Sequence, residues 1–406
     1  MAKKIKTDKK LIEQFLTRGV ENIYPTPEAL RKKLLSGERL RIYNGIDPTG
    51  PTLHLGHMVV LRKLRQLQDL GHEVILLIGD FTAMIGDPTG KSEARKPLTR
   101  QQVLANAKGY QKQASTILRF QGMNAIKLQF NSRWLSKLNL TDLTQLATHF
   151  TAQQTLARGM FKQRMAEGHD LYLHEFFYPL MQAYDSVAMD VDMEVGGNDQ
   201  MFNMLAGRTL MKKLKHKEKF VLTTKLLVDP TGKKMGKTEG NMVTLRDTSE
   251  AMYTKIMTWS DAMILPAFEM LTDVPMAEVR QLEKDMKAGL NPRDVKARLA
   301  LTIIEGLVGK PGASKARDYF ARTVQQKETP DDLPLVRLKK SQAKIPIVDL
   351  FLAAGLVKSK SEARRLIAEK GLAIDGGVVT ADGLVTVADG TVLRRGKRQF
   401  AQVRFA

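Results

Sequence analysis

Two hydrophobic patterns alternate along the first half of the chain. Leucines at helical spacing predict a helix at about residues 56–70, and the unbroken apolar run 74–78 is typical of a strand covered on both faces. The segment 39–43 predicts a strand before them. Because a strand, a helix and a second strand at this spacing form a right-handed crossover, the pattern predicts a doubly wound α/β sheet.

The same alternation continues to about residue 230. Thr99 and Gln102 form a capping box, which predicts the start of a long helix. Residues 126–130 and 191–195 predict two further strands. The whole first half therefore fits one sheet with helices packed on it.

The second half has a different pattern. From about residue 249 the strand signals fade, and a polar, proline-containing stretch at 327–344 is typical of a linker. The tail combines a basic amphipathic helix, 361–370, with short β segments and turns at Gly376-Gly377 and Asp382-Gly383. We expect an α/β domain (1–230), a helical domain that starts with a lysine-rich loop (231–326), the linker (327–344) and a small α+β domain (345–406).

Composition restricts the chemistry and the partners. The chain has 406 residues, no cysteine and a formal net charge of +21. The lack of cysteine excludes disulfides, thiolate metal sites and cysteine nucleophiles, and the charge favours a nucleic acid partner over a merely solvated basic surface. No apolar run is long enough to cross a membrane and the lysine-rich start lacks a secretory signal, so a cytoplasmic location is expected.

Residues 43–57 follow the first predicted strand and lead into a helix, where open α/β sheets bind ligands. His54 and His57 are three residues apart, so both can donate hydrogen bonds to a nucleotide from the positive end of the helix. Gly56 between them lets a purine ring approach the backbone. Two ordinary turn histidines are the alternative. No third zinc ligand is apparent nearby, so no metal site is predicted.

A second basic segment follows the turn at 229–232. Lys234 and Lys237 flank Gly236 and can close over a triphosphate, although an exposed basic loop is the alternative. Because the histidine and lysine segments are the two halves of one known kind of nucleotide site, their joint presence is more specific than either segment alone.

These segments resemble a known family. HLGH at 54–57 and KMGKT at 234–238 resemble the two signatures of class I aminoacyl-tRNA synthetases, and IGDP at 85–88 and GGNDQ at 196–200 are similar to the tyrosyl members. The resemblance extends from about Leu40 to the end of the chain. It implies a catalytic domain with a Rossmann-like sheet. It also implies an enzyme that activates tyrosine with ATP and then transfers tyrosine to the 3′-terminal ribose of tRNA.

The resemblance assigns roles to single residues. Tyr43 and Asp185 would hydrogen-bond the phenolic hydroxyl group, so an analogue that lacks this group would leave buried polar atoms unpaired. Asp87, Tyr178 and Gln182 would hold the ammonium group. Helical spacing places Tyr178, Gln182 and Asp185 on one helix face, although its apolar neighbours also suit core packing. The implied tyrosine-binding residues are Tyr43, Asp87, Tyr178, Gln182, Asp185 and Gln200.

Activation of the amino acid requires no protein nucleophile. The tyrosine carboxylate would attack the α-phosphorus in line, so the enzyme contributes position and positive charge, and Mg²⁺ would accompany ATP without a tightly bound metal. The implied ATP-binding residues are Gly45, Asp47, His54, Gly56, His57, Gly197, Asp199 and Lys237. The implied catalytic residues are Thr49, His54, His57, Lys91, Arg95, Lys234, Lys237 and Thr238.

The tail resembles an S4-type RNA-binding fold. Residues 337–404 contain fourteen Lys or Arg and six Asp or Glu. A basic helix followed by β turns favours RNA binding over a solvated helix, through contacts that follow the phosphates. The implied RNA-binding residues are Lys360, Arg364, Arg365 and Lys370.

Three other functions remain open. A tryptophanyl-tRNA synthetase shares both signatures, but the Tyr43 and Asp185 pair fits a phenol better than an indole. A synthetase-derived RNA splicing scaffold without activity would not need His54, His57 and the lysines. A nucleotidyltransferase for a small metabolite would not need the tail. The resemblance also implies a homodimer that associates through residues 150–173.

Overall fold

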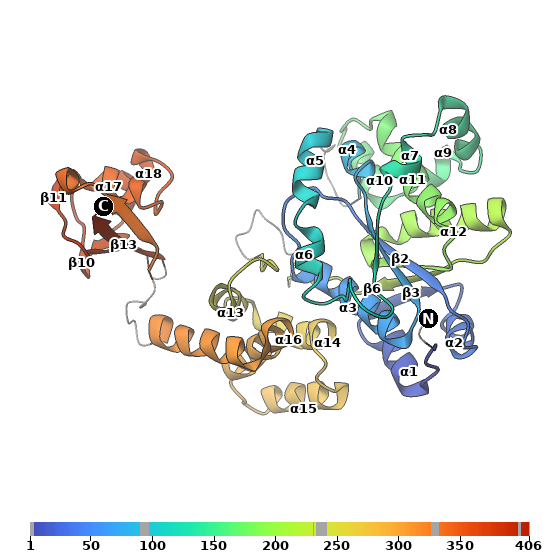
Figure 1. Cartoon of the computed structure of the whole chain (residues 1–406), viewed down its shortest axis with the longest axis horizontal. Helices are drawn as coiled ribbons and strands as arrows, with labels where there is room; N and C mark the ends of the chain where they lie inside the picture. The colour runs from blue at the N-terminus through green and yellow to red at the C-terminus, as the bar shows by residue number, and fades with distance from the viewer. Residues whose placement is uncertain are drawn as a thin grey trace. The chain divides into compact units, whose positions relative to one another are not determined.

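The computed structural model describes residues 4–89, 97–229, 231–232, 242–325, 333–396 and 399–405. They form two compact units, Met1–Lys310 and Pro311–Ala406 (Figure 1). The boundary falls inside α16 (Pro292–Phe320), where Gly309 has a non-helical φ of 82° and Pro311 lacks the amide hydrogen that a continuous helix needs.

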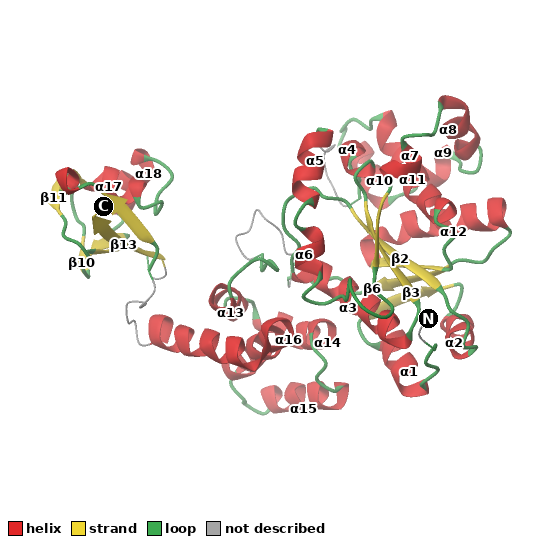
Figure 2. Ribbon diagram, viewed as in Figure 1, coloured by secondary structure: helices red, strands yellow, loops and turns green. Residues whose placement is uncertain are grey.

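Among the described residues, a six-stranded sheet forms the centre of the first unit (Figure 2). Its order is β1-β6-β5-β2-β3-β4, with β1 antiparallel to β6 and the other neighbours parallel. This arrangement confirms the predicted doubly wound α/β fold. The strands are β1 (Val20–Tyr24), β2 (Arg41–Ile46), β3 (Glu73–Ile78), β4 (Lys127–Phe130), β5 (Met193–Gly197) and β6 (Phe220–Thr224).

Helices pack on both faces of this sheet. α3 (Leu55–Leu70) lies on one side, and the closely packed pair α11 (Leu173–Ala188) and α12 (Met201–Lys215) lies on the other (Figure 1). The described residues of the unit also form the first part of α16 and the helices α1 (Lys9–Thr17), α2 (Pro27–Leu35), α4 (Thr82–Ile85), α5 (Arg100–Ala107), α6 (Tyr110–Ala114), α7 (Ser132–Leu135), α8 (Leu140–Ala147), α9 (Ala152–Leu156), α10 (Gly159–Ala166), α13 (Ser249–Met257), α14 (Ile264–Leu271) and α15 (Met276–Lys287).

The strongest sequence patterns predicted their elements well. The helix at 56–70 and the strands at 74–78 and 126–130 are confirmed as α3, β3 and β4. The capping box of Thr99 and Gln102 is also present. The prediction of a long helix there is wrong, because α5 has eight residues and a glycine just beyond its end disfavours continuation of the helix.

The second unit is a small α+β fold. Its described residues form a sheet of order β10-β9-β12-β13-β7, a two-stranded sheet of β8 and β11, and two helices. Apolar side chains from the helices and both sheets share one core. The elements are β7 (Leu335–Leu338), β8 (Lys344–Pro346), α17 (Ile347–Ala353), α18 (Lys360–Ala368), β9 (Leu372–Ile374), β10 (Gly377–Val378), β11 (Leu384–Thr386), β12 (Val392–Arg395) and β13 (Gln399–Phe405).

Two details of this unit differ from the sequence analysis. β7 lies within the expected linker, 327–344, but it pairs with β13 and buries Val336 and Leu338. A four-residue alternation among polar neighbours is too short to stand out in the sequence. The turn between β9 and β10 is centred on Asp375 and Gly376, one residue earlier than predicted, because both have the positive φ that a tight hairpin turn requires.

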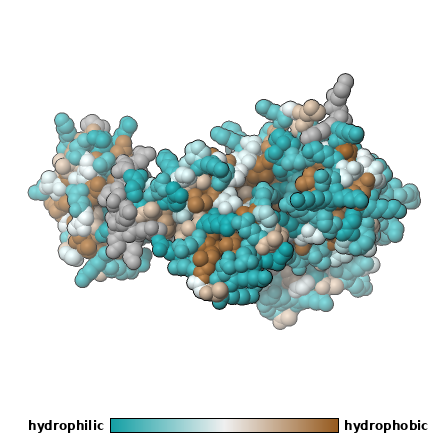
Figure 3. All heavy atoms as spheres, turned by 90° about the horizontal axis from the view of Figure 1, so that it is seen from below, coloured by the Kyte–Doolittle hydropathy of each residue, from teal (hydrophilic) through white to brown (hydrophobic). Residues whose placement is uncertain are grey.

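Polar side chains cover most of the molecular face in Figure 3, and hydrophobic ones gather in smaller patches. Within the described ranges, no helix is long and apolar enough to cross a membrane.

Candidate active site

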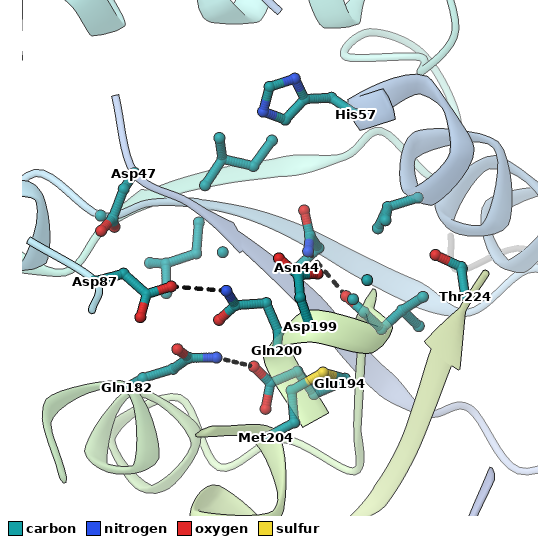
Figure 4. A pocket seen from close by; sticks show the side chains of 18 of the residues that line it. Asn44, Asp47, His57, Asp87, Gln182, Glu194, Asp199, Gln200, Met204 and Thr224 are labelled. Atoms are coloured by element: carbon teal, nitrogen blue, oxygen red, sulfur yellow. Dashed lines mark hydrogen bonds between the residues drawn. The ribbon is translucent and has the colours of Figure 1, made fainter. Parts of the chain in front are cut away.

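A pocket of about 370 Å³ opens at the carboxyl ends of β2 and β5 (Figure 4). The two strands pair at Ile42 and Tyr43, and beyond this point Asn44 Nδ2 donates to the carbonyl oxygen of Val195 across the gap (2.8 Å). The chain leaves β2 and β5 in opposite directions along the sheet. Such a reversal of strand order is where open α/β sheets bind ligands.

The pocket brings together every implied tyrosine-binding residue and the implied nucleotide-binding residues of the first half. Lys91, Arg95, Lys234, Lys237 and Thr238 lie outside the described residues. Those that line the pocket are Tyr43, Gly45, Asp47, Thr49, His54, Gly56, His57, Asp87, Tyr178, Gln182, Asp185, Gly197, Asp199 and Gln200.

His54 and His57 cap the first turn of α3 reciprocally. His54 Nδ1 accepts from the Gly56 amide, and His57 Nδ1 accepts from the His54 amide, both at 3.1 Å. Burial lowers the pKa of His57 to about 3, so its ring is neutral and carries its proton on Nε2. Gly56 is required by the cap itself, because a Cβ atom there would lie 2.8 Å from His54 Cε1.

Side chains of α5 and α6 form hydrogen bonds with the backbone of the loop between β2 and α3. Asn106 donates to the carbonyl oxygen of Pro48 (2.9 Å) and Tyr110 to that of Gly50 (2.6 Å). Gln113 donates to Pro51 (3.0 Å) and accepts from the Leu53 amide (2.8 Å). These contacts fix the backbone that carries Thr49 and His54, and the sequence analysis missed them.

Buried polar groups gather around Asp185. Trp134 Nε1 and Asn131 Nδ2 donate to its two carboxylate oxygens at 2.7 and 3.2 Å. Burial raises the pKa of Asp185 and these hydrogen bonds oppose the rise. The buried hydroxyl group of Tyr43 contacts Ser186 Oγ at 2.9 Å, and burial raises the pKa of Tyr43 as well, so its hydroxyl group is neutral.

Acceptor oxygens line another part of the pocket. Tyr178 donates to Asp47 Oδ2 (2.8 Å), which leaves the lone pairs of the tyrosine oxygen to accept hydrogen bonds. Asp87 Oδ1 accepts from the amide and hydroxyl groups of Thr89, and Gln200 Nε2 donates to Asp87 Oδ2 (2.7 Å; Figure 4). Carboxylates and oxygens so arranged suit a ligand ammonium group.

A buried ion pair of Glu194 and Lys219 adjoins these groups, and the sequence analysis missed it. Glu194 lines the pocket and accepts from Gln182 Nε2 (3.0 Å), while Lys219 donates to Ser186 Oγ (2.8 Å). Burial lowers the pKa of Lys219 and the facing Glu194 carboxylate opposes that shift. The available signal was a charged residue within or just before an apolar strand segment.

Within the described ranges, no cluster of three His, Asp or Glu residues could hold a metal ion. In the second unit, Lys360, Arg364 and Arg365 are more than half exposed and form ion pairs with Asp349, Asp382 and Glu369. Exposed ion pairs are weak, so these cations can exchange partners readily. Lys370 is exposed just beyond α18.

Comparisons with known families agree with this geometry. Residues 35–325 match the family of class I tRNA synthetases for tryptophan and tyrosine, and residues 348–389 match the S4 domain. Among solved structures, the tyrosyl-tRNA synthetase of Archaeoglobus fulgidus complexed with L-tyrosine is 25% identical, with a TM-score of 0.59, over 76% of this chain and all of that one. A truncated mitochondrial tyrosyl-tRNA synthetase of Aspergillus nidulans, 24% identical, shares the fold with a TM-score of 0.63 over 77% of this chain and 93% of that one.

Curated relatives extend the match to nearly the whole length. The tyrosine–tRNA ligase of Thermotoga maritima is 42% identical over 393 residues, which cover 96% of each chain. That of Photobacterium profundum is 43% identical over 396 residues, which cover 97% of this chain and 98% of the relative. The chain therefore belongs to the class I tRNA synthetases, and within them to the family of tyrosine–tRNA ligases.

Proposed function

We propose that the pocket binds tyrosine and ATP, forms tyrosyl-adenylate and pyrophosphate, and that the chain then transfers tyrosine to the terminal ribose of tRNA(Tyr). The observation that carries this proposal is that Tyr43 and Asp185 line one pocket together with Asp87 and the N-terminus of α3. Asp185 accepts a hydrogen bond from the phenolic hydroxyl group, since its two donors, Trp134 and Asn131, leave lone pairs on both oxygens.

The ammonium group of tyrosine is held by Asp87, Tyr178 and Gln182, and Gln200 faces its carboxylate. Tyr178 suits this role because its proton is already donated to Asp47, so that its oxygen acts as an acceptor. The carboxylate of the substrate is then directed at ATP.

ATP lies against the amino end of α3 and the end of β5. The Nε2–H groups of His54 and His57 and the helix dipole favour phosphate, and Asp199 accepts from the ribose hydroxyl groups. Mg²⁺ would accompany the phosphates of ATP and neutralise part of their charge. The ATP-site residues in the pocket are Gly45, Asp47, His54, Gly56, His57, Gly197 and Asp199, and Lys237 completes the set.

Activation is an in-line displacement. A tyrosine carboxylate oxygen bonds to the α-phosphorus and the bond to the bridging oxygen of pyrophosphate breaks. Cations and neutral hydrogen-bond donors stabilise the charge that builds on the leaving group. We assign this role to Thr49, His54, His57, Lys91, Arg95, Lys234, Lys237 and Thr238. A ribose hydroxyl of tRNA then attacks the carbonyl carbon, and AMP leaves.

The test is amino-acid-dependent exchange of labelled pyrophosphate into ATP, with tyrosine, tryptophan and phenylalanine in parallel and no RNA present. Exchange with tyrosine alone is expected. Exchange with tryptophan would transfer the assignment to the tryptophanyl enzymes, and no exchange with any of them would favour the RNA scaffold without activity.

We further propose that two copies associate through residues 150–173 and the adjoining turn of α11. Met165, Tyr172, Leu173 and Phe177 are exposed apolar side chains there, and Leu173 is 80% exposed. A cluster of this kind is typical of a subunit interface. Leu173→Glu should yield monomers in sedimentation, whereas Leu140→Glu, a matched control at 79% exposure outside the segment, should not. A wild-type monomer would contradict the proposal.

The S4-like unit is assigned to tRNA. Lys360, Arg364, Arg365 and Lys370 are placed on and just after α18, where they can follow a phosphate backbone without reading bases.

A further inference from the structure

The ion pair of Glu194 and Lys219 has no role in the reaction described above. Their side chains are 3% and 0% exposed. Lys219 Nζ donates to Glu194 Oε2, to Ser186 Oγ (2.8 Å) and to the carbonyl oxygen of Met204 (3.2 Å). Three acceptors match the three N–H bonds of an ammonium group, so the pair is fully satisfied.

Gly207 on α12 provides the space for this ammonium group. A Cβ atom at that position would lie 2.5 Å from Lys219 Nζ and 2.7 Å from Ser186 Oγ. A glycine inside a helix is destabilising relative to alanine. The helix therefore contains a destabilising residue at the position where an alanine would displace the lysine.

Glu194 determines the orientation of the Gln182 amide. Gln182 Nε2 donates to Glu194 Oε1 (3.0 Å), and a carboxylate can only accept, so the amide nitrogen must face Glu194. The amide oxygen is then turned toward Asp87 and Gln200, as Figure 4 shows. With glutamine at position 194, Lys219 would hold the new amide oxygen, so the amide nitrogen would face Gln182 and favour the reversed orientation of the Gln182 amide.

The same lysine also contacts the phenol end of the pocket. Ser186 Oγ accepts from Lys219 and lies 2.9 Å from the hydroxyl group of Tyr43. One buried cation therefore connects the residues assigned to the amino group of the substrate with those assigned to its hydroxyl group.

We propose that Glu194, neutralised and held by Lys219, is a positioning residue for amino-acid recognition, which keeps the Gln182 oxygen directed at the substrate ammonium group. The inference rests on the proposed function, because Gln182 has this role when tyrosine occupies the pocket. Lys219 lets a carboxylate orient the amide without adding net charge beside Asp87.

The deciding variant is Glu194→Gln in the full-length chain. We expect the equilibrium affinity for tyrosine to fall about ten-fold, as for removal of a hydrogen bond to a charged group. The affinity for 3-(4-hydroxyphenyl)propionate, which lacks the amino group, should change less than two-fold. In pyrophosphate exchange, the KM for tyrosine should rise more than kcat falls.

Glu194→Gln also leaves Lys219 buried without its counter-charge, so a second variant removes both charges. Glu194→Gln/Lys219→Met should fold and leave both orientations of Gln182 available, so tyrosine affinity should return to within about two-fold of wild type. A ten-fold loss that persists in the double variant would contradict the inference. Lys217→Met is the control. Lys217 is two residues from Lys219 in the chain, pairs with Asp192 (2.8 Å) and does not line the pocket. This variant should leave both affinities unchanged.

Equal losses for tyrosine and its deamino analogue, or unchanged tyrosine affinity in Glu194→Gln, would overturn the inference. A wild-type chain that gives no tyrosine-dependent exchange would overturn the proposed function instead, so the two failures are distinguishable.

Discussion

Asp185 is a buried carboxylate whose two oxygens each accept one hydrogen bond, from Asn131 and Trp134. Asp185→Asn should lower kcat/KM for tyrosine by roughly 10- to 100-fold, because the amide nitrogen cannot accept a hydrogen bond from the phenol and leaves a buried donor unpaired. Activity with phenylalanine should change much less. Pyrophosphate exchange with both amino acids measures the ratio.

Asp80→Asn is the control for this substitution. Asp80 is equally buried and accepts two hydrogen bonds from Ser132, but it does not line the pocket. It should reduce stability and leave the preference for tyrosine intact. An unchanged ratio in Asp185→Asn would show that the hydroxyl group is recognised elsewhere.

His72 links pH to stability at a position outside the pocket. Burial lowers its pKa to about 4 in the folded chain, so between pH 6.5 and 4 the unfolded chain binds a proton that the folded chain does not. The free energy of unfolding should therefore fall as the pH falls through this window and gain nothing from His72 above it. Relative to wild type, His72→Gln should remove on the order of 2 kcal/mol of this pH dependence.

Urea unfolding at pH 7.5 and 4.5 measures the difference between wild type and the His72→Gln variant. The control is His169→Gln, which removes an exposed histidine instead of a buried one. If the two variants behave alike, burial of His72 is not the cause.

At the scale of elements, α6 supports the loop that carries Thr49 and His54. Gln113 accepts from the Leu53 amide and donates to the Pro51 carbonyl group, so Gln113→Ala leaves one buried and one part-buried backbone group without this partner. We expect a loss of stability of about 1–3 kcal/mol and a several-fold slower adenylate formation in single-turnover kinetics. Tyrosine affinity should persist, because the phenol-binding residues belong to other elements.

Gln111→Ala is the matched control, since Gln111 is exposed on the same short helix. It should alter neither quantity. A Gln113→Ala variant with normal kinetics would show that the rest of the loop holds its own shape.

Sequence alone predicted elements and residues whose signal is local. α3 and β3 have long regular patterns, and His54 and Asp185 belong to recognisable motifs. The four residues of β7 carried too weak a pattern. Glu194 and Lys219 were missed because the burial of each charge is possible only beside the other. The two residues are 25 positions apart in the chain, and they meet only when β5 and β6 lie side by side.

At the scale of the molecule, two compact units divide the chain at a glycine and a proline within α16. Every residue of the tyrosine pocket belongs to the first unit, while the basic helix α18 belongs to the second. Amino-acid activation and RNA binding should therefore be separable.

A chain that ends at residue 325 should retain tyrosine-dependent pyrophosphate exchange at the wild-type rate and lose most tRNA acylation. Removal of the cations of the second unit should weaken tRNA binding by at least about ten-fold. The slope of log affinity against log salt concentration should decrease in magnitude by about 0.7–0.9 for each phosphate that is no longer neutralised. Filter binding from 50 to 200 mM salt measures both. An identical salt slope in the two chains would place the RNA-binding surface in the first unit, whereas a loss of exchange would show that activation itself depends on the second.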